Sequence, residues 1–368
     1  MMFKRIVALL LMPVIFFSLV SCKEETRNNK ELKESVFVSA EVDEKTTLTY
    51  DVYEDYAVIT GSLSDFETLV IPDSLSGKPV KAIAEDAFCN MTTLLAVTIS
   101  DNVTEIGENA FSGCSKLGNV VLPEGLYSLG TSAFYDCAVL PTVRIPLGTK
   151  IIGAYSFFGC RSLKNVFIPD NVETIGGGAF FDTLWLEEQK DEMVIAGQDI
   201  LIHYSGSEEN VTIPDGVVKI AGFSENFFTK TITMPASVEE ICPYAFANSS
   251  VDSITIGENV EKISDNAFDG CLDLEKIIFN EKTEVIGNFA FTGCQSLTEL
   301  TVPKSVKTVG DSAFARCNGL AVLTFASNKT EIGSNICESC DSLKKISCPK
   351  KSPAIDYAKE NKINIDII

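Results

Sequence analysis

The sequence is poor in histidine and in positive charge. Among 368 residues there is one histidine, His203, which disfavours mechanisms that pair a serine or cysteine nucleophile with histidine. Lysine and arginine total 30 against 51 aspartate and glutamate residues, for a net charge of −21. Phosphate backbones require a basic surface, so a general nucleic-acid binder is excluded. We therefore expect neither an enzyme nor a nucleic-acid partner.

Sequence signals for phosphate, metal or acid–base sites are also scarce. The glycine-rich run IGGGAF (175–180) belongs to a repeat, and its Gly176 position recurs in most units. The acidic pair Glu187 and Glu188 is typical of solvated surface charge. Hydrophobic residues still make up 45% of the chain, which is ample for a large core. We expect no cofactor and no metal.

A long apolar run marks the N-terminus. Two basic residues (4–5) precede an apolar stretch (6–20) that Pro13 interrupts. A basic start, a short apolar run and a small residue are the parts of a secretory signal, and a retained anchor is the alternative. The stretch LVSC (19–22) resembles a bacterial lipobox, which implies a lipid on Cys22 and attachment to a membrane.

The predicted lipoprotein signal peptide covers 1–21, and a flexible acidic tether follows over 22–44. The tether is mostly polar and has few large apolar side chains. Its first residues, KEE (23–25), resemble a surface-export signal of some Gram-negative lipoproteins; the alternative is an ordinary charged tether. The resemblance implies a place in the bacterial cell envelope, at the outer membrane or the cell surface.

A repeat of about 23 residues organises the rest of the chain. Its clearest mark is a phenylalanine that recurs in two series, one at Phe88, Phe111, Phe134, Phe157 and Phe180 and the other at Phe246, Phe268, Phe291 and Phe314. Cys337 takes the next position of the second series. One unit is too short to bury its apolar side alone, so the units must stack into a solenoid.

Each unit contains one strand signal. In LKNVFIP (163–169), Val166 and Ile168 face inward and Phe167 faces outward, which is the period-two pattern of a half-buried strand. Proline then ends the strand because it has no N–H to donate. The segments around the phenylalanines predict short helical or 3-10 turns. Stacking at strand spacing gives about 4.8 Å per coil and ten or eleven coils, so the body is roughly 50 Å long.

Most cysteines follow the same rhythm, three residues after each phenylalanine position. Stacking brings them together, but parallel Cβ vectors suit a disulfide poorly, and free cysteine packs well as a small buried residue. We expect a structural thiol ladder, with disulfides between coils as the alternative. Its members are Cys114, Cys137, Cys160, Cys271, Cys294, Cys317 and Cys340.

The run CESC (337–340) matches a Cys-x-x-Cys pattern, with Cys348 eight residues further on. A redox pair or part of a zinc site would use this spacing. However, each cysteine occupies a regular repeat position, and the single histidine lies far upstream. Structural thiols are the preferred interpretation, and a disulfide from Cys337 to Cys340 or Cys348 is the alternative.

The array is interrupted once and covered at both ends. Two apolar runs (193–196 and 200–204) joined by GQD predict a β-hairpin, with Trp185 before it as a packing anchor. Strand signals precede the first coil, and a helix (354–361) and a strand (363–368) follow the last. The expected organisation is an N-terminal β cap (45–72), a first repeat block (73–183), a hairpin insertion (184–210), a second block (211–349) and a C-terminal helix–strand cap (350–368).

The units IGENAFSGCSKLGNVVLP (106–123) and IGNFAFTGCQSLTELTVP (286–303) resemble the BspA-like branch of leucine-rich repeat proteins. The resemblance covers about 47–368. It implies a right-handed solenoid with short strands on one face, and a bacterial surface protein associated with adhesion to host matrix or to other cells.

A solenoid presents its outward strand positions as a binding surface, because arginine and aromatic residues anchor protein interfaces. The candidate partner-binding face is Val121, Arg144, Lys164, Asn165, Phe167 and Ile278. We predict a protein-binding adhesin, with a monomer favoured. The alternative is a structural envelope lipoprotein that holds partners of the same cell.

Overall fold

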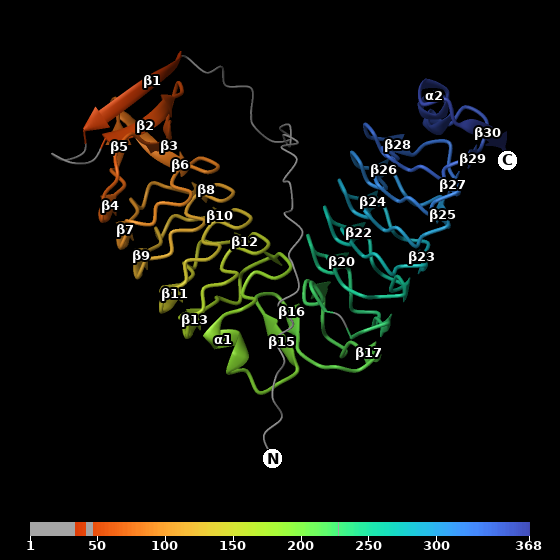
Figure 1. Ribbon diagram of the computed structural model, residues 1–368, viewed down its shortest axis with the longest axis horizontal. Coiled ribbons are helices and arrows are strands. Elements are labelled where there is room, and N and C mark those ends of the chain that lie inside the picture. Colours follow the sequence, from red (N-terminus) through yellow and green to blue (C-terminus); the bar gives the residue numbers. More distant parts are fainter. Residues whose placement is uncertain (1–33, 42–46, 227) are drawn as a thin grey trace.

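The computed structural model describes residues 34–41, 47–226 and 228–368. It is a β-solenoid of about 13 turns, more than the ten or eleven coils expected. The two repeat blocks form the arms of a horseshoe that bends at the hairpin insertion (Figure 1). The predicted signal peptide and lipidated Cys22 lie outside the described residues.

The N-terminal end of the array is covered by antiparallel strands. β1 (Glu34–Glu41) pairs with β2 (Thr47–Val52), which pairs with β3 (Ala57–Ser62). The segment predicted to be a flexible tether (22–44) therefore contains a strand. The run VFV (36–38) within β1 consists of β-branched and aromatic residues, which favour strands. β3 then pairs in parallel with β6 (Lys78–Ile83), to which β5 (Ser74–Leu75) adds a short edge.

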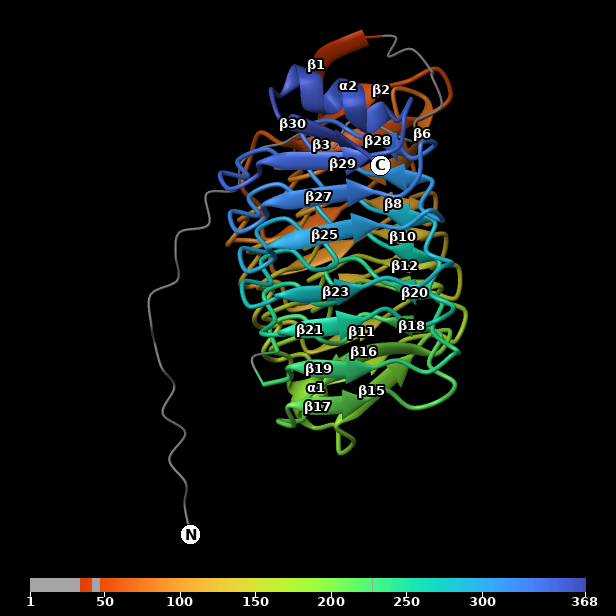
Figure 2. The same ribbon diagram turned by 90° about the vertical axis from the view of Figure 1, so that its right-hand side faces the viewer.

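The longer strands form a column on the outer side of the horseshoe (Figures 1 and 2), which we call the outer column. In the first arm it comprises β4 (Thr68–Val70), β7 (Ala96–Thr98), β9 (Asn119–Val121), β11 (Thr142–Arg144) and β13 (Asn165–Phe167). In the second arm it comprises β17 (Asn210–Thr212), β19 (Thr231–Thr233), β21 (Ser253–Thr255), β23 (Lys276–Ile278), β25 (Glu299–Val302), β27 (Val322–Phe325) and β29 (Lys345–Cys348).

A second column of two-residue strands runs along each arm, although strands were predicted on one face only. In the first arm it comprises β8 (Glu105–Ile106), β10 (Ser128–Leu129), β12 (Ile151–Ile152) and β14 (Thr174–Ile175). In the second it comprises β18 (Lys219–Ile220), β20 (Glu240–Ile241), β22 (Lys262–Ile263), β24 (Val285–Ile286), β26 (Thr308–Val309) and β28 (Glu331–Ile332). Two residues are too few to show a period-two pattern, so the sequence does not reveal this column.

The segments that carry the phenylalanines are hydrogen-bonded turns rather than short helices. The turns of successive coils bond to one another: the Phe111 N–H donates to the Ala133 carbonyl at 2.8 Å, and the Phe134 N–H donates to the Ser156 carbonyl at 2.8 Å. Backbone groups are thus paired on all sides of the coil, as buried polar groups require. These turns lie on the inner side of the horseshoe (Figure 1).

The phenylalanine side chains stack face to face through the centre of each arm. Phe134 and Phe157 lie 5.5 Å apart between ring centroids, with ring planes 2° from parallel. Phe66 and Phe223, which the spacing analysis missed, continue the two series, and both lie 22 or 23 residues from the next member. Tyr204 adds a last ring, tilted on Phe223.

The predicted hairpin is confirmed at the bend. β15 (Met193–Ala196) pairs antiparallel with β16 (Ile200–Tyr204), after the short helix α1 (Leu184–Glu187). β16 continues into the second short-strand column through β18. The buried apolar residues form two clusters that divide near the hairpin, so each arm has its own core.

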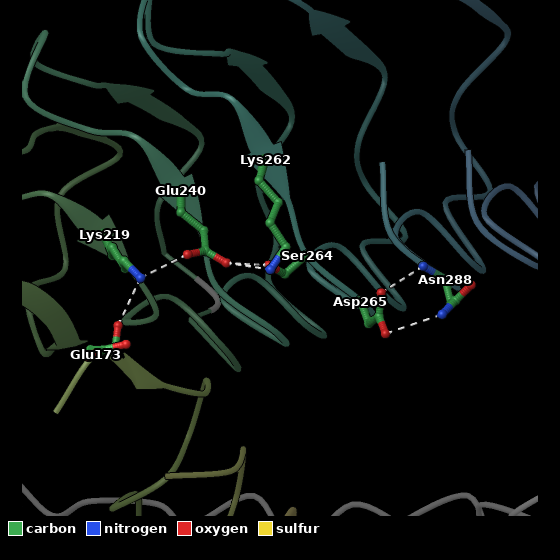
Figure 3. Close-up of polar contacts among 7 residues, drawn as sticks. All are labelled: Glu173, Lys219, Glu240, Lys262, Ser264, Asp265 and Asn288. Carbon is green, nitrogen blue, oxygen red and sulfur yellow. Dashed lines mark hydrogen bonds and ion pairs between the residues drawn. The ribbon is translucent and has the colours of Figure 1, made fainter. Parts of the chain in front are cut away.

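A chain of polar contacts crosses the bend between the two arms (Figure 3). Lys219 donates to the Glu173 carbonyl at 2.8 Å and pairs with the Glu240 carboxylate at 3.0 Å. Lys262 and Ser264 also donate to Glu240, each at 2.8 Å. Burial acts to raise the pKa of Glu240, but the hydrogen bonds and charges of the two lysines outweigh it and leave the pKa lowered. Glu240 is therefore ionised and joins successive coils.

The C-terminal end is covered by α2 (Pro353–Glu360) and β30 (Asn364–Ile367). The Ser352 side chain caps the helix by accepting from the Ala354 N–H. β30 pairs in parallel with β29, and the Tyr357 hydroxyl accepts from the Cys337 N–H at 2.9 Å. These contacts cover the last coil and protect its strand edge.

Candidate partner-binding surface and the joint between the arms

Three large side chains project from neighbouring coils of the first arm's outer column. Val121 is 50% exposed and Phe167 is 48% exposed. Arg144 lies between them, with its guanidinium carbon 5.8 Å from the centroid of the Phe167 ring. Its Nη1 also donates to Glu124 at 2.7 Å. Cation–π and ion-pair contacts therefore hold the arginine in place. We call these three residues, Val121, Arg144 and Phe167, the first-arm patch.

The two polar residues predicted beside this patch are engaged in contacts within the chain. The Lys164 ammonium lies 2.8 Å from the Glu188 carboxylate, in an exposed ion pair. The Asn165 amide donates weakly to the Thr142 hydroxyl at 3.4 Å. Lys164 therefore offers less free charge than its sequence suggests.

The second arm presents a different outer column. Ile278 is 46% exposed, but the matching positions on other coils are threonines: Thr212, Thr233, Thr255 and Thr301. Near the C-terminal end, Ser347 occupies the matching position but is only 4% exposed, and its strand β29 is paired on both sides, with β27 and β30. Ile278 is thus isolated from the first-arm patch.

The thiols of the predicted ladder point into the coils. Six are buried, and Cys340 is half-buried. Each Sγ donates to a phenylalanine carbonyl, as Cys114 does to Phe88 at 3.2 Å and Cys137 to Phe111 at 3.3 Å. Burial raises the pKa of Cys114 to about 12, which disfavours the reactive thiolate.

The cysteines of the CESC run lie at the C-terminal end of the ladder. Cys337 and Cys348 are buried, and the cysteines of the described residues are free thiols. Cys340 is half-buried, and its Sγ donates to the Phe314 carbonyl at 3.0 Å. Among the described residues no group of three or more histidine, cysteine or acidic side chains is placed to hold a metal.

At the bend, turns of the two arms meet directly. The Gly177 N–H donates to the Pro243 carbonyl at 2.7 Å, and the Tyr155 and Tyr244 rings meet edge to face at 5.4 Å. Cys242, which is outside the thiol ladder, is fully buried in the core cluster of the first arm. Sequence reasoning did not identify this joint, which brings together residues about 65 to 90 positions apart.

Several polar groups are desolvated near this joint. Burial lowers the pKa of His203 to about 4, so the histidine is neutral at pH 7, and it packs against Phe181 at 5.9 Å. Burial also raises the pKa of Glu225. The pKa of Asp269 is raised to about 6 because burial outweighs the opposing charge of Arg316.

The Asp269→Asn variant is expected to be more stable than the original chain at pH 7.5, by about 1–2 kcal/mol. The unfolded carboxyl has a pKa near 3.9 and the folded one near 6, so the folded state binds more protons between these values. The stabilising contribution of the Asp269 carboxyl is therefore lost as pH rises from about 4 to 6. Asparagine does not ionise, so the variant does not lose stability in this range. Urea unfolding between pH 4 and 8 measures the effect. Asp273→Asn, at an exposed position, is the control. If the free energy of unfolding depended on pH equally in both variants, Asp269 would not be the group responsible.

The repeating coil, the stacked phenylalanine core and the exposed outer column define a leucine-rich-repeat solenoid, a class whose broad outer surface is open to contact. A family model for the BspA type leucine-rich repeat region matches residues 81–192, 202–282 and 261–361. These matches span more than half of the chain. The chain belongs to the BspA-type leucine-rich repeat family.

Solved structures with a similar repeat come from several bacteria. One is a leucine-rich repeat protein from Bacteroides ovatus, 22% identical over 89% of this chain and 99% of that one, with a TM-score of 0.40. Another is a leucine-rich cell surface protein from Faecalibacterium prausnitzii, 22% identical over 89% and 97%, with a TM-score of 0.36. A third is the pneumococcal vaccine antigen PcpA, 18% identical over 90% and 99%, with a TM-score of 0.39. Curated protein sequences give no significant match.

Proposed function

We propose that this chain is a non-enzymatic protein-binding scaffold of the bacterial cell surface. Anchored through a lipid on Cys22, it would present the first-arm patch to proteins of host matrix or of neighbouring cells. Within the described residues no helix has the length and apolar character needed to cross a membrane. A lipid on Cys22 would attach the chain to a membrane.

The first-arm patch is the observation that carries this proposal. It gathers an aliphatic, an arginine and an aromatic side chain on nearby coils of a rigid array, and these residue types dominate the energetics of protein interfaces. The arginine is already ordered by Phe167 and Glu124, so less side-chain entropy is lost on binding. The threonine-rich column of the second arm has no such cluster.

Phe167→Asp is expected to reduce capture of the partner at least tenfold, because a charge replaces the aromatic anchor of the patch. Ile278→Asp is the matched control, since Ile278 is equally exposed on the other arm. The measurement is pull-down by the purified chain from matrix proteins and, separately, from the envelope fraction of the same cell. Equal loss in both variants would contradict the first-arm patch.

Protease added to intact cells separates surface display from an internal role. A surface adhesin loses its solenoid to the protease, while a chain that stays intact until the envelope is opened is not exposed. Intact chain together with capture from the envelope fraction would favour a scaffold for partners of the same cell.

A further inference from the structure

The outer column has an open edge at the bend. β13 pairs with β11 alone, in a two-stranded parallel sheet. The Asn165 N–H and the Phe167 carbonyl bond toward β11, to the Pro141 carbonyl and the Ile145 N–H respectively. Because successive residues of a parallel strand point their backbone groups to opposite sides, the N–H and C=O of Val166 face the other way. No strand of the described residues pairs with β13 on that side.

A groove lies beside this edge. It has a volume of about 430 Å³ and is bounded by β13, by Trp185 of α1 and by β15 with its turn. α1 covers only the beginning of the edge, where the Trp185 N–H donates to the Leu163 carbonyl at 2.7 Å. Beyond that point Phe167 and Ile195 remain 48% and 46% exposed. We call this feature the β13 groove.

Natural sheets normally cover or charge such an edge, because unpaired backbone groups beside apolar side chains attract other strands. The corresponding edge in the second arm, β17, places Asn210 and Thr212 outward, and both are polar. The β13 groove instead combines an aromatic ring, an indole and an exposed isoleucine. These features favour addition of a strand.

The charge of the groove indicates what it accepts. Asp170 and Asp199 line it, both are exposed, and neither forms an ion pair with a described residue. A partner with a lysine or arginine would compensate them. A second copy of this chain would instead bring the same carboxylates against each other across a symmetric contact, which is unfavourable.

We propose that the β13 groove binds an extended peptide segment of a partner protein, which adds a strand to β13. The segment carries apolar residues at alternate positions for the groove and a basic residue for Asp170 or Asp199. Its backbone bonds with the N–H and C=O of Val166. This inference rests on the proposed function and names the kind of partner element that the first arm recognises.

The test uses the full chain in detergent and a fluorescent peptide, acetyl-Lys-Val-Thr-Phe-Thr-Val-Lys-amide, with anisotropy as the readout. We expect saturable binding. Two N-methylated analogues, one modified at positions 3 and 5 and one at positions 4 and 6, lose the same number of backbone N–H groups but on opposite sides of the strand. One analogue should bind at least tenfold more weakly and the other should bind like the parent, because only one set faces β13.

Protein variants locate the site. Val166→Pro removes the outward N–H at an edge position where proline is tolerated, and Ile195→Lys changes a side chain that is 46% exposed in the groove. Each should weaken peptide binding at least tenfold, while Ile278→Lys should leave it unchanged. Circular dichroism verifies that the variants fold.

Several outcomes would overturn the proposal. These are absence of peptide binding, equal affinity in all variants, or equal affinity of both N-methylated analogues. A dimer that Ile195→Lys disrupts would assign the groove to a second copy, and tighter peptide binding after deletion of residues 1–33 would assign it to the chain's own N-terminal segment. Partner capture that depends on Phe167 but not on Val166→Pro would leave the proposed function standing and reject the added strand.

Discussion

Replacing Phe157 by alanine is expected to lower the free energy of unfolding by about 3–5 kcal/mol, as large-to-small changes in a packed core do. The ring is fully buried and stacks on two neighbours, Phe134 at 5.5 Å and Phe180 at 5.4 Å. Its loss leaves a cavity in the middle of the column, and the hydrogen-bonded turns on either side restrict collapse of the coil around it. Urea unfolding followed by circular dichroism gives the change.

The adjacent residue provides the control. Phe158 stacks on Tyr135 and Phe181 in a parallel column, but its side chain is half-buried. Phe158→Ala is expected to cost about 1–2 kcal/mol, because less apolar area returns to water. Equal losses in the two variants would show that the central column is not the main support of the arm.

The same substitution tests whether the arms unfold separately. In a repeat array, each coil contacts only its neighbours, so a substitution that destabilises one coil can let the coils on one side of it unfold before the others. The two core clusters divide near the hairpin. We expect Phe157→Ala to separate unfolding into an early transition of the first arm and a later one of the second, whereas the original chain should show closer transitions.

The 23-residue periodicity of the sequence predicted the repeating features of the fold. Identical apolar positions every 23 residues led to the solenoid and to the phenylalanine column, and the two apolar runs joined by GQD led to the hairpin. These features depend on local patterns of burial, which a sequence displays directly. Phe223 was missed although it lies 23 residues before Phe246, because its unit lacks the usual Ala-Phe pair.

The features that depend on distant contacts could not be predicted. Nothing in the spacing of Tyr155 and Tyr244 indicates that their rings meet, since the contact exists only once the hairpin turns one arm back toward the other. The open edge of β13 could not be predicted for a similar reason. An edge exists only where no further strand pairs, and the pairing of strands is known only from the fold. For the candidate surface, Phe167 and Arg144 were predicted to face outward, but the groove beside them required the fold.

Gly177→Ala is expected to open the bend. An added Cβ would lie 2.1 Å from the Tyr244 carbonyl oxygen and 2.5 Å from its carbon, and these are backbone atoms with little freedom to move. The corresponding residues in earlier coils, such as Thr131 and Ala154, carry a Cβ, so the coil itself does not require glycine at this position. The contact between the arms, and not the conformation of the coil, therefore requires glycine at position 177.

The substitution should also break the bond from the Gly177 N–H to the Pro243 carbonyl and cost about 1–3 kcal/mol, as overpacking does. Small-angle X-ray scattering should give a larger radius of gyration. Cys242, fully buried at the joint, should become reactive toward a thiol reagent, with the modified residue identified by mass spectrometry. Gly118→Ala is the control, because the nearest atom to its Cβ is 4.0 Å away. An unchanged scattering curve together with an unreactive Cys242 would mean that other contacts hold the arms, with the lysine–glutamate chain of Figure 3 as the next candidate.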